Sequence, residues 1–376
     1  MYFCIGQNII DSGSALLYNI SLRKKKQKGK MKMHRRMYGY GGDMEKAIPL
    51  FRGGRIEAVT APYDPLAARI ATENGMAFYA CTAAMEGNGP KDCCIDAWGA
   101  AVDSPCPNAP GLLAKNVQRI VSLATADHVK GVTLDYCRYP SPAAASACAG
   151  MTVCFCSACC AKMEQEGMDV EAMRRAVGKW PAWEETDLPL LRRFLRFRAK
   201  SVTAYVKALY DGVKAADREK ELGAYVFAPS LAPLVGQSYA SLAGCTDFLS
   251  PMLYRYYRHP VGIACLDHEL GALQKMREEL TELQQSKAAR TLCALTGIDG
   301  IPSEKELKEK GLPMKMLWKE LMEARRQTEG RVLIPIILLE DPRFLEVSDA
   351  VRIFDTDGVD FFLFAREYFE KLDVFQ

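Results

Sequence analysis

The chain has 376 residues, enough for two average domains or for one parallel α/β barrel with insertions. Hydrophobic residues make up 49% of it and charged residues 25%, which is ordinary for a soluble globular protein. No apolar run approaches the roughly 20 residues of a membrane helix, and the first residues lack the basic-then-apolar order of a secretion signal. We therefore expect a cytoplasmic protein with no membrane partner.

Basic residues are concentrated near the start of the chain. Nine of the 49 Lys and Arg residues lie between Arg23 and Arg36, and without them the formal net charge falls from +3 to −6. A short lysine-rich segment ahead of a domain is more often a solvated extension than a nucleic-acid site. We interpret residues 1–36 as such an extension, with Met31 or Met33 as an alternative start, and expect no nucleic-acid partner.

From Met37 onward, short apolar runs alternate with segments of helical composition, several of which close on a glycine such as Gly53 or Gly75. This alternation predicts a parallel sheet with crossover helices. The fold we expect is a (β/α)8 TIM barrel that forms a single domain over residues 37–376. The expected strands cover residues 37–40, 56–61, 77–82, 132–136, 223–228, 248–254, 332–339 and 359–364.

Residues 291–297 also have the composition of a strand, which would be a ninth strand in an eight-stranded barrel. Because the surrounding residues 262–330 are rich in Ala, Leu, Glu, Lys and Arg, we interpret this segment as a helix or a connection. If it is a strand, residues 37–40 are the false strand, and Asp135 ends the third strand rather than the fourth.

Two long insertions interrupt the alternation. Residues 86–110 follow the third expected strand and are too rich in Gly, Pro, Asp and Cys for a helix, so we expect a long loop over the barrel mouth. Residues 141–183 link the fourth strand to a segment with helical spacing at residues 190–214. Both insertions follow strand ends, which predicts long loop insertions at the C-terminal face, where barrel loops build active sites.

Four cysteines at short spacing, Cys154, Cys156, Cys159 and Cys160, form the pattern C-x-C-x-x-C-C in the second insertion. Thiolates spaced in this way can converge on zinc or on an iron–sulfur cluster. However, no second C-x-x-C and no paired histidines follow at finger-like spacing, and no secretion signal favours disulfides. We expect reduced thiols packed at a helix N-terminus, with no metal and no cofactor, and keep a metal site as the alternative.

The segment Gly131–Pro140, GVTLDYCRYP, ends an apolar strand in a carboxylate. Val132 and Leu134 can face a layer of helices, which turns Asp135 inward at the barrel mouth. An aspartate is a poor strand former and is costly to bury unpaired, so Asp135 needs a partner or a function there. Arg138 is either its salt-bridge partner or a clamp for the substrate.

This strand end resembles the G-[hydrophobic]-D-Y-x-R-Y-P motif of a family of glycosyl-hydrolase-like (β/α)8 proteins. CFCSAC at Cys154–Cys159, DFLSPMLY at Asp247–Tyr254 and GMAFYACTAA at Gly75–Ala84 extend the resemblance over most of residues 37–376. The resemblance implies a sugar-processing barrel in which Asp135 is the leading catalytic candidate. The chain departs from well-studied retaining glycosidases, because no Asn-Glu pair ends the fourth strand and no glutamate ends residues 223–228.

Glycoside cleavage usually requires two carboxyl groups at the mouth, about 5 Å apart for retention or about 6.5–9.5 Å apart for inversion. Asp247 and Asp360 lie at strand starts, on the face of a barrel that is associated with stability. Glu340 ends the seventh expected strand and would reach the same mouth as Asp135, so we choose it as the partner, although it could be a surface residue. The loop alternatives are Glu86, Asp92 and Asp299.

Other side chains near strand ends are candidates for holding the sugar. Aromatic rings there can stack on sugar rings, or they can belong to the core. We expect substrate contacts from Tyr79, Glu86, Arg138, Tyr139, Met252 and Tyr254.

These residues favour three functions. The first is a glycoside hydrolase acting on an oligo- or polysaccharide, with Asp135 as nucleophile or base and Glu340 as general acid. The second is a carbohydrate-binding or regulatory barrel without chemistry, which the missing Asn-Glu pair permits. The third is a thiol or metal protein that uses the cysteines of residues 154–160. Nothing in the sequence indicates an oligomeric state.

Overall fold

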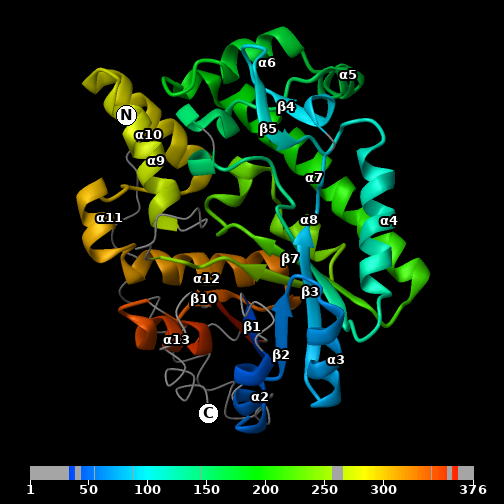
Figure 1. The fold of residues 1–376 in the computed structure, drawn as a ribbon. Coiled ribbons are helices and arrows are strands. Elements are labelled where there is room, and N and C mark those ends of the chain that lie inside the picture. Colours follow the sequence, from blue (N-terminus) through cyan, green and yellow to red (C-terminus); the bar gives the residue numbers. More distant parts are fainter. Residues whose placement is uncertain are drawn as a thin grey trace. The chain divides into compact units, whose positions relative to one another are not determined.

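Parallel strands surrounded by helices form the part of the chain that the structure describes (Figure 1). The structure, a computed structural model, describes residues 34–38, 44–54, 56–87, 89–144, 146–255, 266–339, 341–353 and 358–362, all within the unit that starts at His34. The basic extension expected at residues 1–36 lies outside this part, apart from the start of the first strand. Among the described residues, every helix is too short or too polar to traverse a lipid bilayer.

The main sheet has nine strands in the order β10-β11-β1-β2-β3-β6-β7-β8-β9, and its neighbouring strands pair in parallel. Parallel pairing requires a crossover between consecutive strands, which the helices supply here. The strands are β1 (His34–Tyr38), β2 (Ala58–Ala61), β3 (Ala77–Ala83), β6 (Gly131–Asp135), β7 (Glu221–Val226), β8 (Phe248–Pro251), β9 (Val332–Leu333), β10 (Ile336–Leu338) and β11 (Gly358–Phe362).

A strand is present at each predicted position, although most ends differ from the predicted bounds by one to three residues. The first strand begins at His34, ahead of the predicted start at Met37. The predicted strand at residues 332–339 is divided into β9 and β10. Pro335 lies between these two strands, and it has no N–H group to donate to the ladder.

The sheet is curled, so that strands far apart in its order meet inside it. The guanidinium carbon of Arg36 on β1 lies 4.1 Å from the centroid of the Phe248 ring on β8, although β2, β3, β6 and β7 lie between these strands in the sheet. At the two ends of the sheet, β9 and β10 follow each other in the chain, and Met252 forms a parallel bridge with Ile336 of β10. The fold is therefore α/β and TIM-barrel-like.

The helices begin where the sequence supplies capping residues. Asp64 accepts a hydrogen bond from the N–H of Ala67 at the start of α3, which satisfies one free donor of the first turn. Thr281 and Gln284 form a reciprocal capping box at the start of α10, and this helix covers most of residues 291–297, which confirms that they are not a strand. The helices around the sheet are α2 (Met44–Arg52), α3 (Pro65–Glu73), α4 (Leu112–Ala124), α7 (Leu188–Ala216), α8 (Tyr239–Ala243), α9 (Leu266–Glu278), α10 (Glu282–Thr296), α11 (Glu304–Lys310), α12 (Met314–Thr328) and α13 (Phe344–Ile353).

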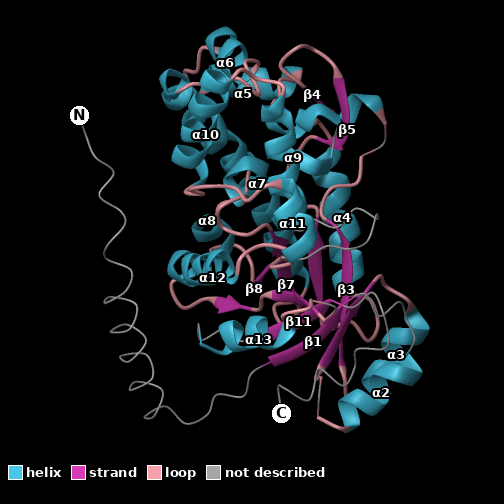
Figure 2. Ribbon diagram, turned by 90° about the vertical axis from the view of Figure 1, so that its left-hand side faces the viewer, coloured by secondary structure: helices cyan, strands magenta, loops and turns pink. Residues whose placement is uncertain are grey.

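The two insertions lie together, beyond the ends to which the strand arrows point (Figures 1 and 2). The first was expected to be a long loop, but it contains the antiparallel strands β4 (Cys93–Ile95) and β5 (Ala101–Pro105). Their turn is held by the Asp96 carboxylate, which accepts hydrogen bonds from the N–H groups of Trp98 and Ala100. The second insertion contains short 3₁₀ turns, α5 (Ser157–Gln165) and α6 (Val170–Val177).

A close contact inside the sheet makes one glycine necessary for the fold. A Cβ atom on Gly223 of β7 would lie 2.0 Å from the Phe248 ring on β8. We expect Gly223→Ala to lower the free energy of unfolding by about 1–3 kcal/mol, because the ring has to move in a packed interior. Urea unfolding of the two proteins measures this difference.

The control is Gly271→Ala on α9, where a Cβ atom would meet no neighbour within 4 Å. Alanine favours a helix interior over glycine by about 0.5–1 kcal/mol, so this variant should be slightly more stable than the wild type. Equal effects of the two substitutions would contradict the packing explanation.

Candidate active site and cysteine cluster

Asp135 is the last residue of β6, and its side chain is half-buried at the C-terminal end of the sheet. Its backbone oxygen accepts a hydrogen bond from the N–H of Ala84, which follows β3. Its Oδ1 atom accepts a second one of 2.7 Å from the N–H of Tyr136, whose φ of 49° lies in the left-handed region. The chain therefore turns immediately after β6 and fixes the carboxylate at the strand end, where the sequence predicts it.

Arg138 is buried beside this carboxylate. Its guanidinium carbon lies 4.9 Å from the centroid of the Tyr136 ring and 4.6 Å from that of Phe227, the residue after β7. Its Nη1 atom donates a hydrogen bond of 3.2 Å to the backbone oxygen of Tyr139. The two rings and the backbone hold the positive charge at the mouth, close enough to act on Asp135.

Burial raises the pKa of Asp135 above its ordinary value of 3.8, while the Arg138 guanidinium and the Tyr136 N–H act in the opposite direction. A carboxyl group with a raised pKa keeps its proton to higher pH. General acids in glycosidases have this property, because they must protonate the leaving group near neutral pH.

A second buried carboxyl group contacts the segment that follows β6. Glu269 on α9 accepts a hydrogen bond of 2.8 Å from the backbone N–H of Ala143, and burial raises its pKa. Side-chain hydrogen bonding with Ser141 and the charge of Arg138 act against this rise. Glu269 therefore ties α9 to the segment that follows β6. The sequence alone does not identify Glu269, because a glutamate in a charged amphipathic helix carries no local signal of burial.

Two more carboxylates, Glu86 and Glu340, were predicted to lie at this end of the sheet. Glu86 follows β3, is exposed, and forms an ion pair of 3.0 Å with Nη1 of Arg119. Glu340 lies outside the described residues. Its neighbour Asp341 is buried and pairs with Arg255 at 2.7 Å, which makes Asp341 a structural residue of this end.

The structure places Tyr79 away from this mouth. It pairs in register with Gly131, the first residue of β6, and thus lies near the N-terminal end of the sheet. Its hydroxyl group donates to Glu221 at 2.8 Å and accepts from Arg36 at 3.2 Å. This polar network fills the interior at the N-terminal end, so Tyr79 is left out of the candidate site.

The other predicted apolar contacts are buried in the core. Tyr139 is 0% exposed, Met252 is 7% exposed and Tyr254 is 3% exposed, so none of them presents a ring or side chain to a sugar. Tyr136, which the sequence analysis did not select, is 53% exposed next to Asp135. Its position one residue after the strand end was the signal that could have identified it.

Cys137 also lies beside Asp135, but it is buried. Burial raises its pKa to about 12, and its Sγ atom donates a hydrogen bond to the backbone oxygen of Tyr225. It therefore stays protonated at neutral pH, which argues against a thiolate nucleophile at the mouth.

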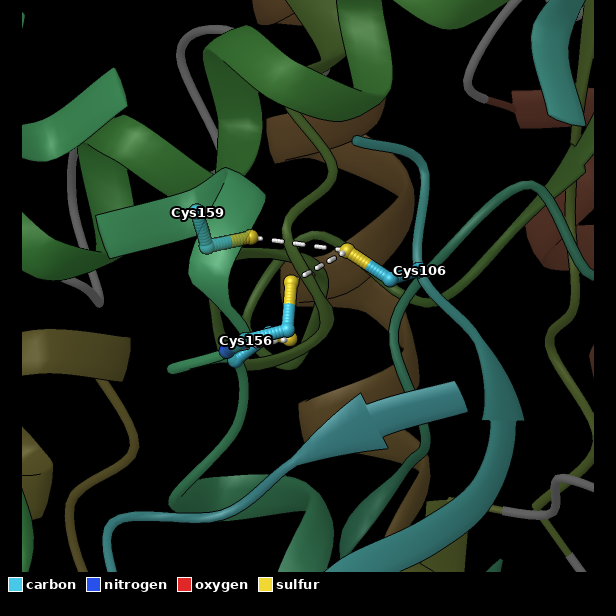
Figure 3. Close-up of side chains that lie close together, drawn as sticks. Cys106, Cys156 and Cys159 are labelled. Carbon is cyan, nitrogen blue, oxygen red and sulfur yellow. Dashed lines mark hydrogen bonds between the residues drawn. The ribbon is translucent and has the colours of Figure 1, made fainter. Parts of the chain in front are cut away.

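Four other cysteines converge between the two insertions. The Sγ atoms of Cys106, Cys154, Cys156 and Cys159 all lie within 4.8 Å of one another. Cys106 follows β5 in the first insertion, and its sulfur lies 3.4 Å from that of Cys159 and 3.7 Å from that of Cys156 (Figure 3). Zn–S bonds of about 2.3 Å place the sulfurs of a tetrahedral zinc site about 3.8 Å apart.

The cluster depends on how the insertions dock. The N–H of Phe155 donates a hydrogen bond of 2.7 Å to the oxygen of Ile95, which brings the loop ahead of α5 against β4. Cys156 is the N-cap of α5, so the expected position of the thiols at a helix N-terminus is confirmed. The sequence groups Cys160 with Cys154, Cys156 and Cys159, but the cluster contains Cys106 from the other insertion in its place. Cys160 donates a hydrogen bond to the backbone oxygen of Phe155.

Polar groups surround the sulfurs. Cys154 accepts hydrogen bonds from the N–H groups of Ile95 and Cys156, and the Asn108 side chain donates to Cys159 at 3.3 Å. Hydrogen bonds from Cys106, and then from other thiols of the cluster, hold the pKa of Cys154 below its usual range. Donors aimed at sulfur favour the thiolate form, which is the form that binds metals.

No protein-family model matches the sequence, and no curated protein matches it either. Among solved structures, the β-galactosidase of the Antarctic haloarchaeon Halorubrum lacusprofundi is similar, with a TM-score of 0.53 and 12% identity over 88% of this chain and 52% of that chain. The β-galactosidase of the psychrophilic Marinomonas ef1 has a TM-score of 0.55 and 12% identity over 88% and 54% of the two chains. The chain thus spans about half the length of these proteins and shares their TIM-barrel-like fold.

The raised pKa of Asp135 predicts how its removal changes stability with pH. When folding raises the pKa of a carboxyl group, the folded protein loses stability as the pH rises from the unfolded value through the folded value. Asp135→Asn removes this loss. The variant should therefore exceed the wild type in free energy of unfolding at neutral pH, and the excess should shrink towards about pH 3.

Urea unfolding of both proteins over this pH range measures the difference, with equal m-values as the control that both unfold in the same way. A difference that does not change with pH would contradict the raised pKa.

Proposed function

We propose that the protein is a glycoside hydrolase that cleaves an oligo- or polysaccharide at the C-terminal mouth of its barrel. The observation that carries this proposal is the half-buried carboxyl group of Asp135, held at a strand end with a raised pKa. The TIM-barrel-like fold shared with β-galactosidases is consistent with it but does not by itself assign a reaction.

In this proposal, residues 332–338 count as one strand interrupted at Pro335, which completes a closed (β/α)8 barrel. The pairing supports this count, because β9 pairs with β8, and β10 pairs with β11, which in turn pairs with β1. A closed barrel presents all its strand ends around one mouth. Side chains at the ends of different strands can then face the same sugar.

Asp135 acts in this mechanism as the general acid that protonates the oxygen of the leaving sugar. This role differs from the nucleophile or base favoured by the sequence, because the raised pKa suits a proton donor. Glu340 remains our choice for the second carboxylate, as nucleophile or as base for a water, and the exposed Glu86 is the alternative. In this mechanism Arg138 and the exposed Tyr136 ring orient the sugar, which their contact beside Asp135 supports.

A second function is proposed for the cysteine cluster. We infer that Cys106, Cys154, Cys156 and Cys159 hold a structural zinc ion that joins the two insertions, in place of the expected metal-free thiols. The carrying observation is the convergence of four sulfurs from two chain segments at distances close to those of a tetrahedral site. Four protein ligands leave no open position for a substrate, which favours a structural role over a catalytic one.

The hydrolase proposal predicts the effect of Asp135→Asn on activity. On a panel of oligosaccharides and alkyl glycosides that includes β-galactosides, whose leaving oxygens require protonation, the variant should lose about 10²–10⁴-fold in kcat/KM, because the neutral amide cannot donate the proton. Binding of the same sugars, measured by calorimetry, should persist.

The matched control is Asp247→Asn, which removes a carboxylate at the opposite end, where Asp247 pairs with Lys214 at 2.9 Å. Its activity per folded molecule should equal that of the wild type. Sugar binding without any cleavage by the wild type would instead indicate a carbohydrate-binding barrel.

The zinc proposal predicts opposite outcomes for two adjacent cysteines. Cys159→Ser should lose the metal, because the serine hydroxyl is a far weaker ligand than a thiolate, whereas Cys160→Ser should retain it. Zinc per chain, measured by plasma mass spectrometry after purification without chelators, distinguishes the two variants. Absence of stoichiometric zinc from the wild type, or equal loss from both variants, would refute this assignment.

A further inference from the structure

A buried arginine lies close to the cysteine cluster and has no carboxylate partner among the described residues. Arg198, in the middle of α7, is 0% exposed. Its Nη2 atom donates a hydrogen bond of 3.1 Å to the backbone oxygen of Gly150. Its Nε and Nη1 atoms have no hydrogen-bond partner among the described residues. Its guanidinium carbon lies 4.6 Å from the centroid of the Tyr139 ring.

A guanidinium ion in this position needs a negative charge nearby. Removing a cation from water costs several kcal/mol even after the protein relaxes around it. One hydrogen bond and two ring contacts, with Tyr139 and with Phe194 at 5.6 Å, offset only part of that cost. Burial lowers the pKa of Arg198, and the charges that oppose this are those of the Tyr139 hydroxyl and of the Cys94, Cys154 and Cys159 thiols. The cluster lies close to Arg198, because Asn108, whose side chain donates to Cys159, also donates at 2.9 Å to Ser201, less than one turn along α7 from Arg198.

A metal-bound cluster would supply the negative charge that the Arg198 guanidinium requires. One Zn²⁺ ion with four thiolates carries a net charge of −2. One flanking cation is Lys162, whose Nζ atom donates at 2.6 Å to the side-chain oxygen of Asn108, while the amide nitrogen of Asn108 donates to Cys159. Arg198 is the second cation and the buried one. Arg174, which also approaches the cysteines through Cys160, has Glu171 as an ion-pair partner.

We propose that Arg198 is the buried counter-cation of a four-thiolate metal centre and thereby sets the affinity of that centre for zinc. This inference rests on the zinc site proposed above. Arg198 acts as a positioning residue, because it touches no reacting group and works through the charge of the thiolates. A zinc ion with four thiolates gives the buried guanidinium a counter-charge, so zinc binding relieves part of the cost of burying it.

The test separates the charge of Arg198 from its hydrogen bond to Gly150. Arg198→Gln is neutral but keeps a donor for the Gly150 oxygen, whereas Arg198→Lys keeps the positive charge. Arg196→Met, at an exposed position on the same helix, is the matched control. Zinc affinity of the full-length reduced protein is measured by competition with a chromophoric chelator. Cobalt substitution reports the thiolate-to-metal charge-transfer band.

We expect Arg198→Gln to weaken zinc binding by about 10–100-fold, the range found when a group behind a metal ligand is removed. Its cobalt band should move to longer wavelength, because the thiolate electrons are no longer held by a nearby cation. Arg198→Lys and Arg196→Met should keep the affinity and the band of the wild type. A residue that merely packs or ties Gly150 would not move the band.

The outcomes are distinguishable. If the wild type binds zinc but Arg198→Gln binds it equally tightly with an unshifted band, the counter-cation role is wrong and the zinc site stands. If the wild type binds no stoichiometric zinc or cobalt, both proposals fall. If Arg198→Gln does not fold, Arg198→Met, which is also neutral, takes its place: a loss of about 10-fold or more in zinc affinity upholds the role, and wild-type affinity with an unshifted band overturns it.

Discussion

Parallel strand pairing is the constraint on which the rest of this structure depends. Because the strands of the main sheet run in one direction, all their C-terminal ends lie at the same edge. The residues at these ends, among them Asp135 as the last residue of β6 and Phe227 directly after β7, are therefore gathered at one end of the sheet. The two insertions start from that edge as well, which is why they can pack against each other. Because the sheet is curled, these strand ends are arranged around a common opening instead of along a straight edge.

Buried charged groups are paired at one end of the sheet, whereas at the other end a carboxyl group has a raised pKa. At the N-terminal end, Arg36, Tyr79 and Glu221 form a connected network in which each polar group has a partner. Such an arrangement stabilises the barrel and leaves little capacity for chemistry. At the C-terminal end, Asp135 remains half-buried, and burial raises its pKa even though Arg138 lies close by. Proton transfer to a sugar oxygen requires a carboxyl group of this kind, whose raised pKa lets it keep its proton to higher pH.

The insertions illustrate why a metal suits this part of the chain. The β4–β5 strand pair, α5 and α6 are short elements, and small units of this kind bury too little apolar surface to be stable alone. A zinc ion held by thiolates from both insertions would link segments that are some fifty residues apart in the sequence, from Cys106 to Cys154–Cys159. The Arg198 guanidinium packs on the ring of Tyr139, which belongs to the segment that follows β6 and Asp135.

The sequence by itself determined the alternation of strands and helices and the position of Asp135 at a strand end. These follow from local patterns of apolar residues, caps and turns, which act over a few residues. Only the tertiary structure decided that Tyr79 lies at the opposite end, because this depends on the register of β3 with β6. It also decided that Cys106 rather than Cys160 completes the cluster, and that Arg198 is buried beside it. Such contacts arise from the docking of distant segments, and no local spacing encodes them.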